Sequence, residues 1–406
     1  MTAQTFDAGA VHASAPADPA QPAHWGGVFA MTLCVFALIA SEFMPVSLLT
    51  PLARDLRVTE GLAGQGIAIS GVFAVLTSLC IATLAARVDR KRLLLALTAM
   101  MGLSGVIVAV APNYLTYMAG RALIGIVVGG FWSMSAATAM QLVPASQVPR
   151  ALAIFNGGNA LATVVAAPLG SYLASFVGWR GAFFALVPVA AAAFAWQWFS
   201  LPALPARPRA KGTRNVFQLL QRRQVRLGML AVGMFFMGQF ALFTYLRPFL
   251  ETVTGVEAAT LSLVLLAIGA AGFVGTMLIG RFLKLGFYGA LTVIPVLMAA
   301  IAVALIAMGG SLSATTVLLG LWGLVATAAP VGWWLWVART LPQDAEAGGG
   351  LMVAVVQLAI AAGSTAGGLL FDRSGYRGTF AFSAGLLLVG AFLVVLTSRA
   401  AQAEST

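Results

Sequence analysis

One acidic residue, Glu42, lies well inside a long apolar stretch of this 406-residue chain. A lone carboxylate in a hydrocarbon layer is costly and usually marks an ion or substrate pathway. Arg121 lies in another apolar stretch, and at 1.5 Å per helical residue the two side chains are expected at similar depth. Because burial disfavours a charged carboxylate and a nearby guanidinium favours it, this pair could carry a proton. A static ion pair that joins two helices is the alternative.

Further polar and aromatic side chains in the first half of the chain could contact a solute. Trp132 and Ser135 share one helical face with Arg121 by their spacing, and Trp132 could either stack on a flat ring or simply pack. Asn156 and Asn159 share a face of the next stretch. They could hydrogen-bond a ligand or join two helices.

The second half offers corresponding candidates in three stretches. They are Gln239, Tyr245 and Arg247, then Trp333, Trp334 and Trp336, and finally Gln357 and Ser364. Buried amides offer both donors and acceptors, as recognition of a purine edge or of sugar hydroxyls requires, so Gln239 and Gln357 are the strongest. Trp334 belongs to a cluster with Trp333 and Trp336, and some of these three must face lipid.

Twelve long apolar stretches carry these residues. The chain is 60% hydrophobic and 9% charged, with a mean hydropathy of +0.95, whereas a soluble domain has roughly 25% charged residues. Stretches of about 20 apolar residues cross a bilayer as helices. The expected spans are 26–51, 62–85, 93–111, 115–139, 149–174, 180–200, 227–250, 259–280, 287–308, 314–338, 346–370 and 377–398. The predicted fold class is an all-α membrane protein.

The positive charge follows the loops. Four cations, Arg87, Arg90, Lys91 and Arg92, follow the second stretch, and seven more lie in 201–226. This one-sided distribution is typical of cytoplasmic loops and argues against nucleic-acid binding, despite a net charge of +11. We expect both termini in the cytoplasm. The expected segments are a disordered tail (1–24), a six-helix half (25–200), a cytoplasmic loop (201–226), a second six-helix half (227–398) and a tail (399–406).

An internal repeat relates the two halves. An offset of 197 residues carries Gly178, Trp179, Arg180, Gly181 and Phe183 onto Gly375, Tyr376, Arg377, Gly378 and Phe380. The same offset carries Phe43 onto Phe240 and Glu42 onto Gln239. One half therefore holds a titratable carboxylate where the other holds an amide. Parallel six-helix repeats of this kind place a substrate site near the midplane between the halves.

The loop after the second stretch predicts a conformational latch. Asp89 stands beside Arg90 and Arg92 at a helix junction, where a latch is a better interpretation than a substrate ligand. No P-loop, HExxH or clustered Cys/His pattern is present, so we expect no enzyme activity, no metal site and no cofactor. Both cysteines lie in spans, and no disulfide is indicated.

These residues resemble the major facilitator superfamily. Asp89–Arg92 is similar to its loop 2–3 signature, although Ala85 and Lys91 stand where glycines are usual; Arg121 matches the fourth-span arginine of the drug:proton antiporters, and Ala167–Gly170 is similar to their fifth-span motif. A closer resemblance is to the bacterial purine ribonucleoside efflux pumps, carried by EFMPVSLLTPLARDL, GGFWSMSA, GQFALFTYLRP, PVGWWLWVART and VAVVQLA. It extends over residues 42–359 and supports Glu42, Trp132, Gln239, Tyr245, Arg247, Trp333 and Gln357.

The resemblance implies a monomeric proton antiporter in the bacterial inner membrane that exports inosine, guanosine and their analogues. Glu42 and Arg121 would couple protons, and the substrate contacts would come from Trp132, Asn156, Asn159, Gln239, Tyr245, Trp334 and Gln357. A sugar or arabinoside exporter, a broader drug:proton antiporter and a non-transporting receptor or scaffold are the alternatives.

Overall fold

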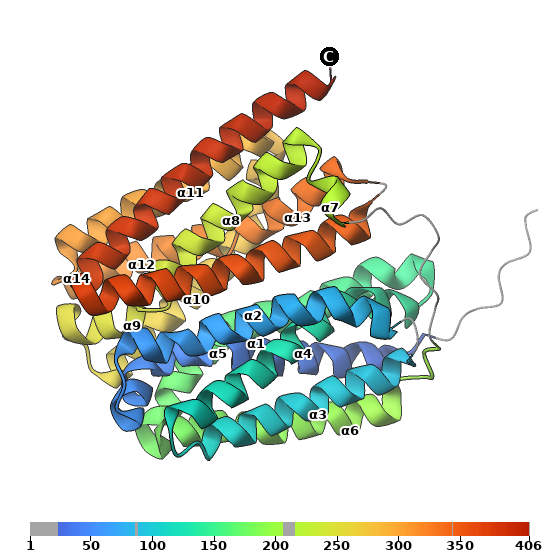
Figure 1. Cartoon of the computed structure of the whole chain (residues 1–406), viewed down its shortest axis with the longest axis horizontal. Coiled ribbons are helices and arrows are strands. Elements are labelled where there is room, and N and C mark those ends of the chain that lie inside the picture. Colours follow the sequence, from blue (N-terminus) through green and yellow to red (C-terminus); the bar gives the residue numbers. More distant parts are fainter. Residues whose placement is uncertain (1–22, 86–87, 206–215, 343, 406) are drawn as a thin grey trace, which may run out of the picture.

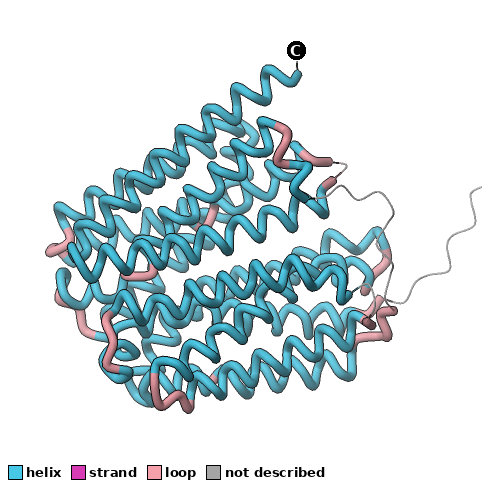
Figure 2. Tube along the Cα trace, in the orientation of Figure 1, coloured by secondary structure: helices cyan, strands magenta, loops and turns pink. Residues whose placement is uncertain are grey.

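The structure is a computed structural model that describes residues 23–85, 88–205, 216–342 and 344–405. Within these ranges the chain is helical and contains no strand. Loops gather at the two ends of the molecule and long helices run between them (Figure 2). Helices satisfy every backbone hydrogen bond internally, which is the condition for crossing a bilayer.

Two groups of helices lie one beside the other (Figure 1). The first group is α1 (Trp25–Leu56), α2 (Glu60–Ala85), α3 (Arg90–Ala109), α4 (Tyr114–Gln141), α5 (Val148–Phe184) and α6 (Leu186–Ser200), with a short 3-10 turn at Ala145–Gln147. The second group is α7 (Val216–Leu219), α8 (Arg223–Phe243), α9 (Leu246–Phe249), the π-helical turn η2 (Leu250–Thr254), α10 (Ala258–Leu285), α11 (Phe287–Met308), α12 (Leu312–Ala326), α13 (Ala329–Thr340) and α14 (Ala345–Ser405). We call these groups the N-half and the C-half.

The described residues form twelve membrane-crossing segments. Among them, ten helical segments are long and apolar enough to cross a membrane, and two of these, of 51 and 57 residues, contain a break and can cross twice. The predicted fold class is therefore confirmed. The span expected at 314–338 is made of two helices, α12 and α13, because Pro330 cannot continue the hydrogen-bond ladder of α12. The expected C-terminal tail extends α14 as far as Ser405.

The breaks in the two long helices, α5 and α14, confirm the 197-residue internal repeat. Gly178 in α5 and Gly375 in α14 have φ of 70° and 66° and lie 197 residues apart. An arginine follows each break and lies over the preceding aromatic ring, Arg180 on Trp179 at 4.3 Å and Arg377 on Tyr376 at 5.9 Å. The two halves therefore share local geometry as well as sequence.

Phe43 and Phe240, which the offset also relates, stack on one another at 5.5 Å between the ring centroids. When a residue contacts its own symmetry mate, the two-fold axis passes between them. The pseudo-two-fold axis of this molecule therefore runs beside Phe43 and Phe240. Glu42 and Gln239 are their immediate neighbours in sequence.

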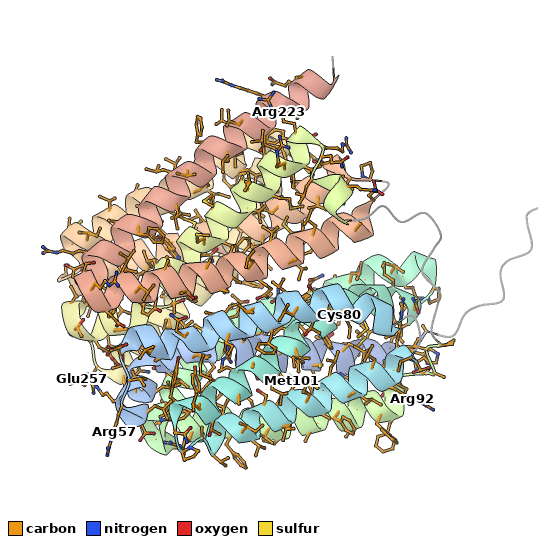
Figure 3. All side chains as sticks on the ribbon, in the orientation of Figure 1. Arg57, Cys80, Arg92, Met101, Arg223 and Glu257 are labelled. Carbon is orange, nitrogen blue, oxygen red and sulfur yellow. The ribbon has the colours of Figure 1, made fainter. Side chains whose placement is uncertain are left out.

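The ends of the molecule differ in how tightly the halves meet. Arg57 and Glu257 mark one end and Arg92 and Arg223 the other (Figure 3); we call them the Arg57 end and the Arg92 end. Hydrogen bonds between the halves gather toward the Arg57 end, for example Gln65 with Thr365 at 3.0 Å. On the α1 face that carries Phe43, exposure increases toward the Arg92 end, where Phe29 is 44% exposed. The interface is therefore closed at the Arg57 end.

The halves also meet through close backbone contact between α5 of the N-half and α10 of the C-half. Pro168 has no N–H, which leaves the Val164 carbonyl without its helical partner. A Cβ at Gly269 would lie 2.7 Å from both the Cα and the carbonyl oxygen of Val164. Glycine is therefore required at this contact, as is common where membrane helices pack closely.

We predict that Gly375→Ala destabilises the protein and that Gly385→Ala, a control in the same helix, does not. The backbone of Gly375, with φ 66° and ψ −165°, suits glycine almost alone, and strain of this kind costs about 1–3 kcal/mol. Gly385 has open space around it and helical geometry. Thermal unfolding of purified protein in detergent measures the difference, and equal midpoints for the two variants would contradict the prediction.

Candidate substrate and proton site

Helix α1 contains two prolines, and the first of them shapes the surroundings of Glu42. Pro45 has no N–H, so the Ser41 carbonyl one turn earlier is free to accept from elsewhere. Arg121 of α4 supplies the donors, with Nη1 to the Ser41 oxygen at 2.7 Å and Nη2 to the Glu42 main-chain oxygen at 3.0 Å. Its Nε donates to the Gly66 carbonyl at 3.0 Å. Arg121 therefore ties α4 to both α1 and α2.

This arrangement differs from the expected side-chain pair. Among the described ion pairs there is none between the Glu42 carboxylate and Arg121, which is itself only 1% exposed. The guanidinium is occupied by main-chain oxygens and by Ser70 Oγ at 3.3 Å. The static ion-pair alternative therefore finds no support. A direct part for Arg121 in proton coupling stays a prediction.

The Glu42 carboxylate instead faces the C-half. Glu42 is 3% exposed, and its Oε1 accepts a hydrogen bond from Nε2 of Gln357 in α14 at 3.2 Å. Beside this pair, α2 and α14 lie in close backbone contact, since a Cβ at Gly71 of α2 would lie 2.8 Å from the Gln357 carbonyl oxygen. The structure thus brings together two predicted site residues that are 315 positions apart.

Two buried amides near the axis keep an unused acceptor. Oε1 of Gln357 and Oε1 of Gln239 are both buried without a hydrogen-bond partner. Buried polar atoms are almost always satisfied, so such exceptions call for an explanation. Gln239 adjoins the Phe43–Phe240 stack in sequence, and Gln357 contacts Glu42. The two amides can accept N–H or O–H groups from a polar solute between the halves.

The second proline of α1 acts in the same way as the first. Pro51 frees the Ser47 carbonyl, which accepts a hydrogen bond from Nη1 of Arg247 in α9. Arg247 also pairs with Glu251, with 2.8 Å between Nε and Oε1. Arg247 is 7% exposed, so it is a buried contact between the halves. Each freed carbonyl lies four residues before a proline, Ser41 before Pro45 and Ser47 before Pro51. The two prolines were therefore the signal in the sequence for where both arginines bind.

The remaining predicted substrate contacts are spread over several environments. Trp132 is half-buried and makes a T-shaped ring contact with Phe155 at 6.2 Å between the centroids. Asn156 is exposed and donates to the Leu152 carbonyl of its own helix at 2.9 Å. Asn159 is half-buried. The tryptophan cluster divides, with Trp334 exposed and its neighbours Trp333 and Trp336 buried. The roles of these residues stay predictions.

Tyr245 lies in the packed contact between the halves. Its hydroxyl donates to the Ser364 carbonyl at 2.7 Å, and its ring stacks on Phe371 at 5.3 Å. A Cβ at Gly64 of α2 would overlap the Tyr245 hydroxyl. In this conformation both the hydroxyl and the ring of Tyr245 make contacts within the protein. A contact between Tyr245 and the substrate stays a prediction.

The predicted latch residues bind within the N-half. Asp89 caps α3 through the Arg92 N–H at 3.2 Å and accepts the Leu204 N–H at 2.9 Å. The Arg90 N–H donates to the Leu204 carbonyl at 2.9 Å. These bonds fasten the start of α3 to the segment after α6. In this conformation the three residues hold one half together, and their part in a conformational latch stays a prediction.

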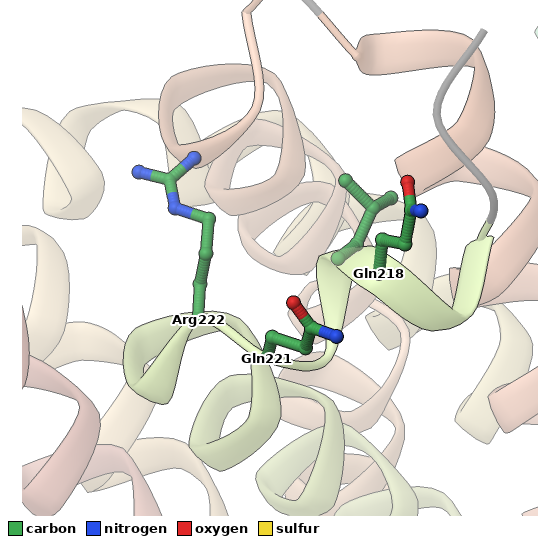
Figure 4. Close-up of a pocket in the computed structure, with 4 residues that line it drawn as sticks. Gln218, Gln221 and Arg222 are labelled. Atoms are coloured by element: carbon green, nitrogen blue, oxygen red, sulfur yellow. The ribbon is translucent and has the colours of Figure 1, made fainter.

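A cavity of about 370 Å³ lies at the Arg92 end of the C-half. It is lined by Gln218, Leu219, Gln221 and Arg222, at the junction of α7 and α8 (Figure 4). None of the predicted site residues lines it. Among the described residues no group of three or more His, Cys, Asp or Glu could hold a metal ion.

Comparison with known proteins identifies the family of this chain. Residues 31–352 match the model of the Major Facilitator Superfamily. The chain is 66% identical to transcription regulatory protein OpdE of Pseudomonas aeruginosa, over 98% of each chain. It is 40% identical to the purine ribonucleoside efflux pump NepI of Salmonella typhimurium, over 94% of this chain and 96% of that pump.

Two solved structures share the fold. A mutant of the nucleoside transporter NupG superposes with a TM-score of 0.75 at 12% identity, over 91% of this chain and 98% of that one. The human organic anion transporter MFSD10 superposes with a TM-score of 0.66 at 18% identity, over 92% and 100%. With its family match, two related halves and twelve membrane segments, the chain belongs to the major facilitator superfamily and is a multi-pass membrane transporter, not an enzyme.

Proposed function

We propose that this transporter is a proton-driven antiporter that exports purine ribonucleosides across the bacterial inner membrane. The observation that carries the proposal is the buried Glu42 carboxylate and its 3.2 Å hydrogen bond to Gln357 of the opposite half. A carboxylate at this depth is retained for function rather than for stability. Its partner moves with the other half, so the bond responds to the movement that transport requires.

The chemistry of the pair accommodates both protonation states. An ionised carboxylate is an acceptor only, and a protonated one gains an O–H donor. The Gln357 amide offers an N–H group to the first state and its unused Oε1 to the second. Rotation of one amide therefore suffices for Glu42 to remain hydrogen-bonded when it gains or loses a proton.

The energetics are adequate for export of a neutral solute. One proton that moves down a potential of ~150 mV supplies about 3.5 kcal/mol. That free energy supports a concentration gradient of roughly 300-fold. For a neutral nucleoside, a single titratable site between the halves is therefore sufficient.

A nucleoside suits the groups near the axis. The Phe43–Phe240 stack offers aromatic faces, and the free acceptors of Gln239 and Gln357 can receive base N–H or ribose O–H groups. The 40% identity to a purine ribonucleoside efflux pump supports the same substrate class. We further propose that one chain is the working unit, since both halves of the site lie in it.

The charge distribution supports an orientation. Arg92 and Arg223 lie at the Arg92 end. Arg90 and Lys91 lie with Arg92 in the first turn of α3, and Arg226 lies with Arg223 in the first turn of α8. Since cytoplasmic loops are enriched in Lys and Arg, we assign this end to the cytoplasm. The termini then lie inside, and the structure represents a form closed toward the outside.

Inosine uptake into inverted membrane vesicles with an imposed proton gradient tests the function. We expect accumulation that a protonophore abolishes. Accumulation of a pentose without inosine would favour a sugar exporter, and accumulation of unrelated apolar compounds would favour a drug antiporter. One relative is named a transcription regulatory protein. A receptor would therefore be indicated if inosine bound without any flux.

We predict that Glu42→Gln abolishes proton-driven accumulation of inosine and leaves inosine exchange across the membrane measurable. The amide keeps the shape of the side chain and can still bond Gln357, but it cannot carry a proton. Glu257→Gln, an exposed acid at the start of α10, is the matched control and should behave as wild type. Uphill accumulation by Glu42→Gln would show that the proton is carried elsewhere.

Gln239→Leu is expected to weaken inosine binding roughly tenfold, since a hydrogen bond is worth ~1 kcal/mol and more when its partner is left unsatisfied. Gln221→Leu, in the exposed segment before α8, is the control. Inosine titration of purified protein measures both dissociation constants. An affinity equal to that of wild type would remove Gln239 from the site.

A further inference from the structure

A carboxylate of the C-half caps a helix of the N-half at the Arg57 end. Asp372 of α14 accepts the Thr59 hydroxyl at 2.6 Å through Oδ2 and the Gly61 N–H at 3.0 Å through Oδ1. Thr59 and Gly61 flank the first residue of α2. The first N–H groups of a helix have no partner within it and form its positive end, so a carboxylate is well suited to bind there.

The helices are shaped for this contact. A Cβ at Gly61 would overlap the Asp372 carboxylate, and Gly61 also lies against Gly368, one turn before Asp372 on α14. Two glycines thus bring α2 and α14 into backbone contact. Any larger residue at position 61 would push the carboxylate away from the helix start.

A second bond crosses the interface at the same end, on different helices. Arg247 of α9 donates to the Ser47 carbonyl that Pro51 leaves free in α1, and its Nε donates to Glu251 Oε1 at 2.8 Å. Both contacts therefore join a charged side chain of the C-half to uncharged groups of the N-half, which are the Thr59 hydroxyl and Gly61 N–H in one case and the Ser47 carbonyl in the other. Neither needs a complementary charge on the N-half.

The repeat shows that the carboxylate cap has no symmetric counterpart. The 197-residue offset places Ser175 of α5 at the position of Asp372. Its hydroxyl donates to the Tyr172 carbonyl of its own helix at 2.7 Å. The start of α10, which corresponds to the start of α2, therefore receives no acid from α5. The halves are joined by this cap on one side of the interface only.

We infer that Asp372, with Arg247 in support, forms an outer clasp that must open before the transporter can expose its site to the outside. Asp372 is then a positioning residue, since it acts through the start of α2 and sets how often the outer side opens. The inference rests on the transport function and orientation proposed above. It requires no particular substrate.

Thiol labelling at Ala68 tests the clasp. Ala68 lies two turns beyond Gly61 on the α2 face that meets α14 and is buried in this form. Ala68→Cys, in a protein with Cys34→Ser and Cys80→Ser, is labelled from outside by a membrane-impermeant maleimide in right-side-out vesicles. We expect Asp372→Asn to raise the labelling rate roughly tenfold, the effect of losing one charge-assisted hydrogen bond.

Asp55→Asn is the matched control. Asp55 is an acid at the same end, but it bonds Trp179 and Arg180 of its own half. Its removal should leave the labelling rate unchanged. Gly61→Ala is a second route to the same opening and should raise labelling without any change of charge, because the added methyl displaces Asp372.

Unchanged labelling in both Asp372→Asn and Gly61→Ala would overturn the clasp, provided that both variants elute as folded protein in detergent. Equal increases in Asp372→Asn and Asp55→Asn would also overturn it, since general loosening would then be the cause. The assay needs no substrate, so its outcome is separate from that of inosine uptake. Labelling of Ala68→Cys only in inverted vesicles would reject the orientation.

Discussion

The arrangement around Glu42 depends on one main-chain feature, the carbonyl that Pro45 leaves without a helical donor. A free carbonyl inside a membrane protein must find a donor elsewhere, and Arg121 provides it across three helices. The backbone on either side of Glu42 is thereby fixed to the N-half. With Arg121 occupied by main-chain oxygens, the carboxylate is available to the other half, where Gln357 binds it. In the transport cycle proposed above, the fixed backbone and the bond to the opposite half would make Glu42 respond to the relative position of the halves.

Prolines and glycines shape the interface between the halves. Pro51 and Pro168 free the carbonyls of Ser47 and Val164, and a residue of the C-half binds the first and covers the second. Glycines such as Gly61, Gly71 and Gly269 allow backbones to meet without side chains between them. Contacts of this kind are directional and short, so they break when the halves separate by a small distance. They suit an interface that must open and close repeatedly.

Much of the fold was predictable from sequence because membrane helices are long, apolar and uniform. Length and hydropathy predicted the twelve spans, and the 197-residue offset paired Gly178 with Gly375, the two glycines at which the structure shows matching breaks. The pairing of Glu42 with Gln357 was not predictable, because it depends on how two distant helices rotate about their axes. Asp372 was missed for a related reason: its partner is a helix start, which leaves no charge or motif in the sequence. Arg121 was found, but its contacts are with the backbone, which sequence patterns of side chains do not reveal.

The stack of Phe43 on Phe240 has a consequence for how such a site can arise. Two identical halves that assembled as a homodimer would meet through this same ring pair, because a residue on a two-fold axis contacts its own copy. They would also carry the same residue twice at the positions of Glu42 and Gln239, either two carboxylates or two amides. Covalent fusion into one chain removes that requirement. A single chain can keep one acid for the proton and one amide for the cargo, a division of labour that a symmetric dimer cannot encode.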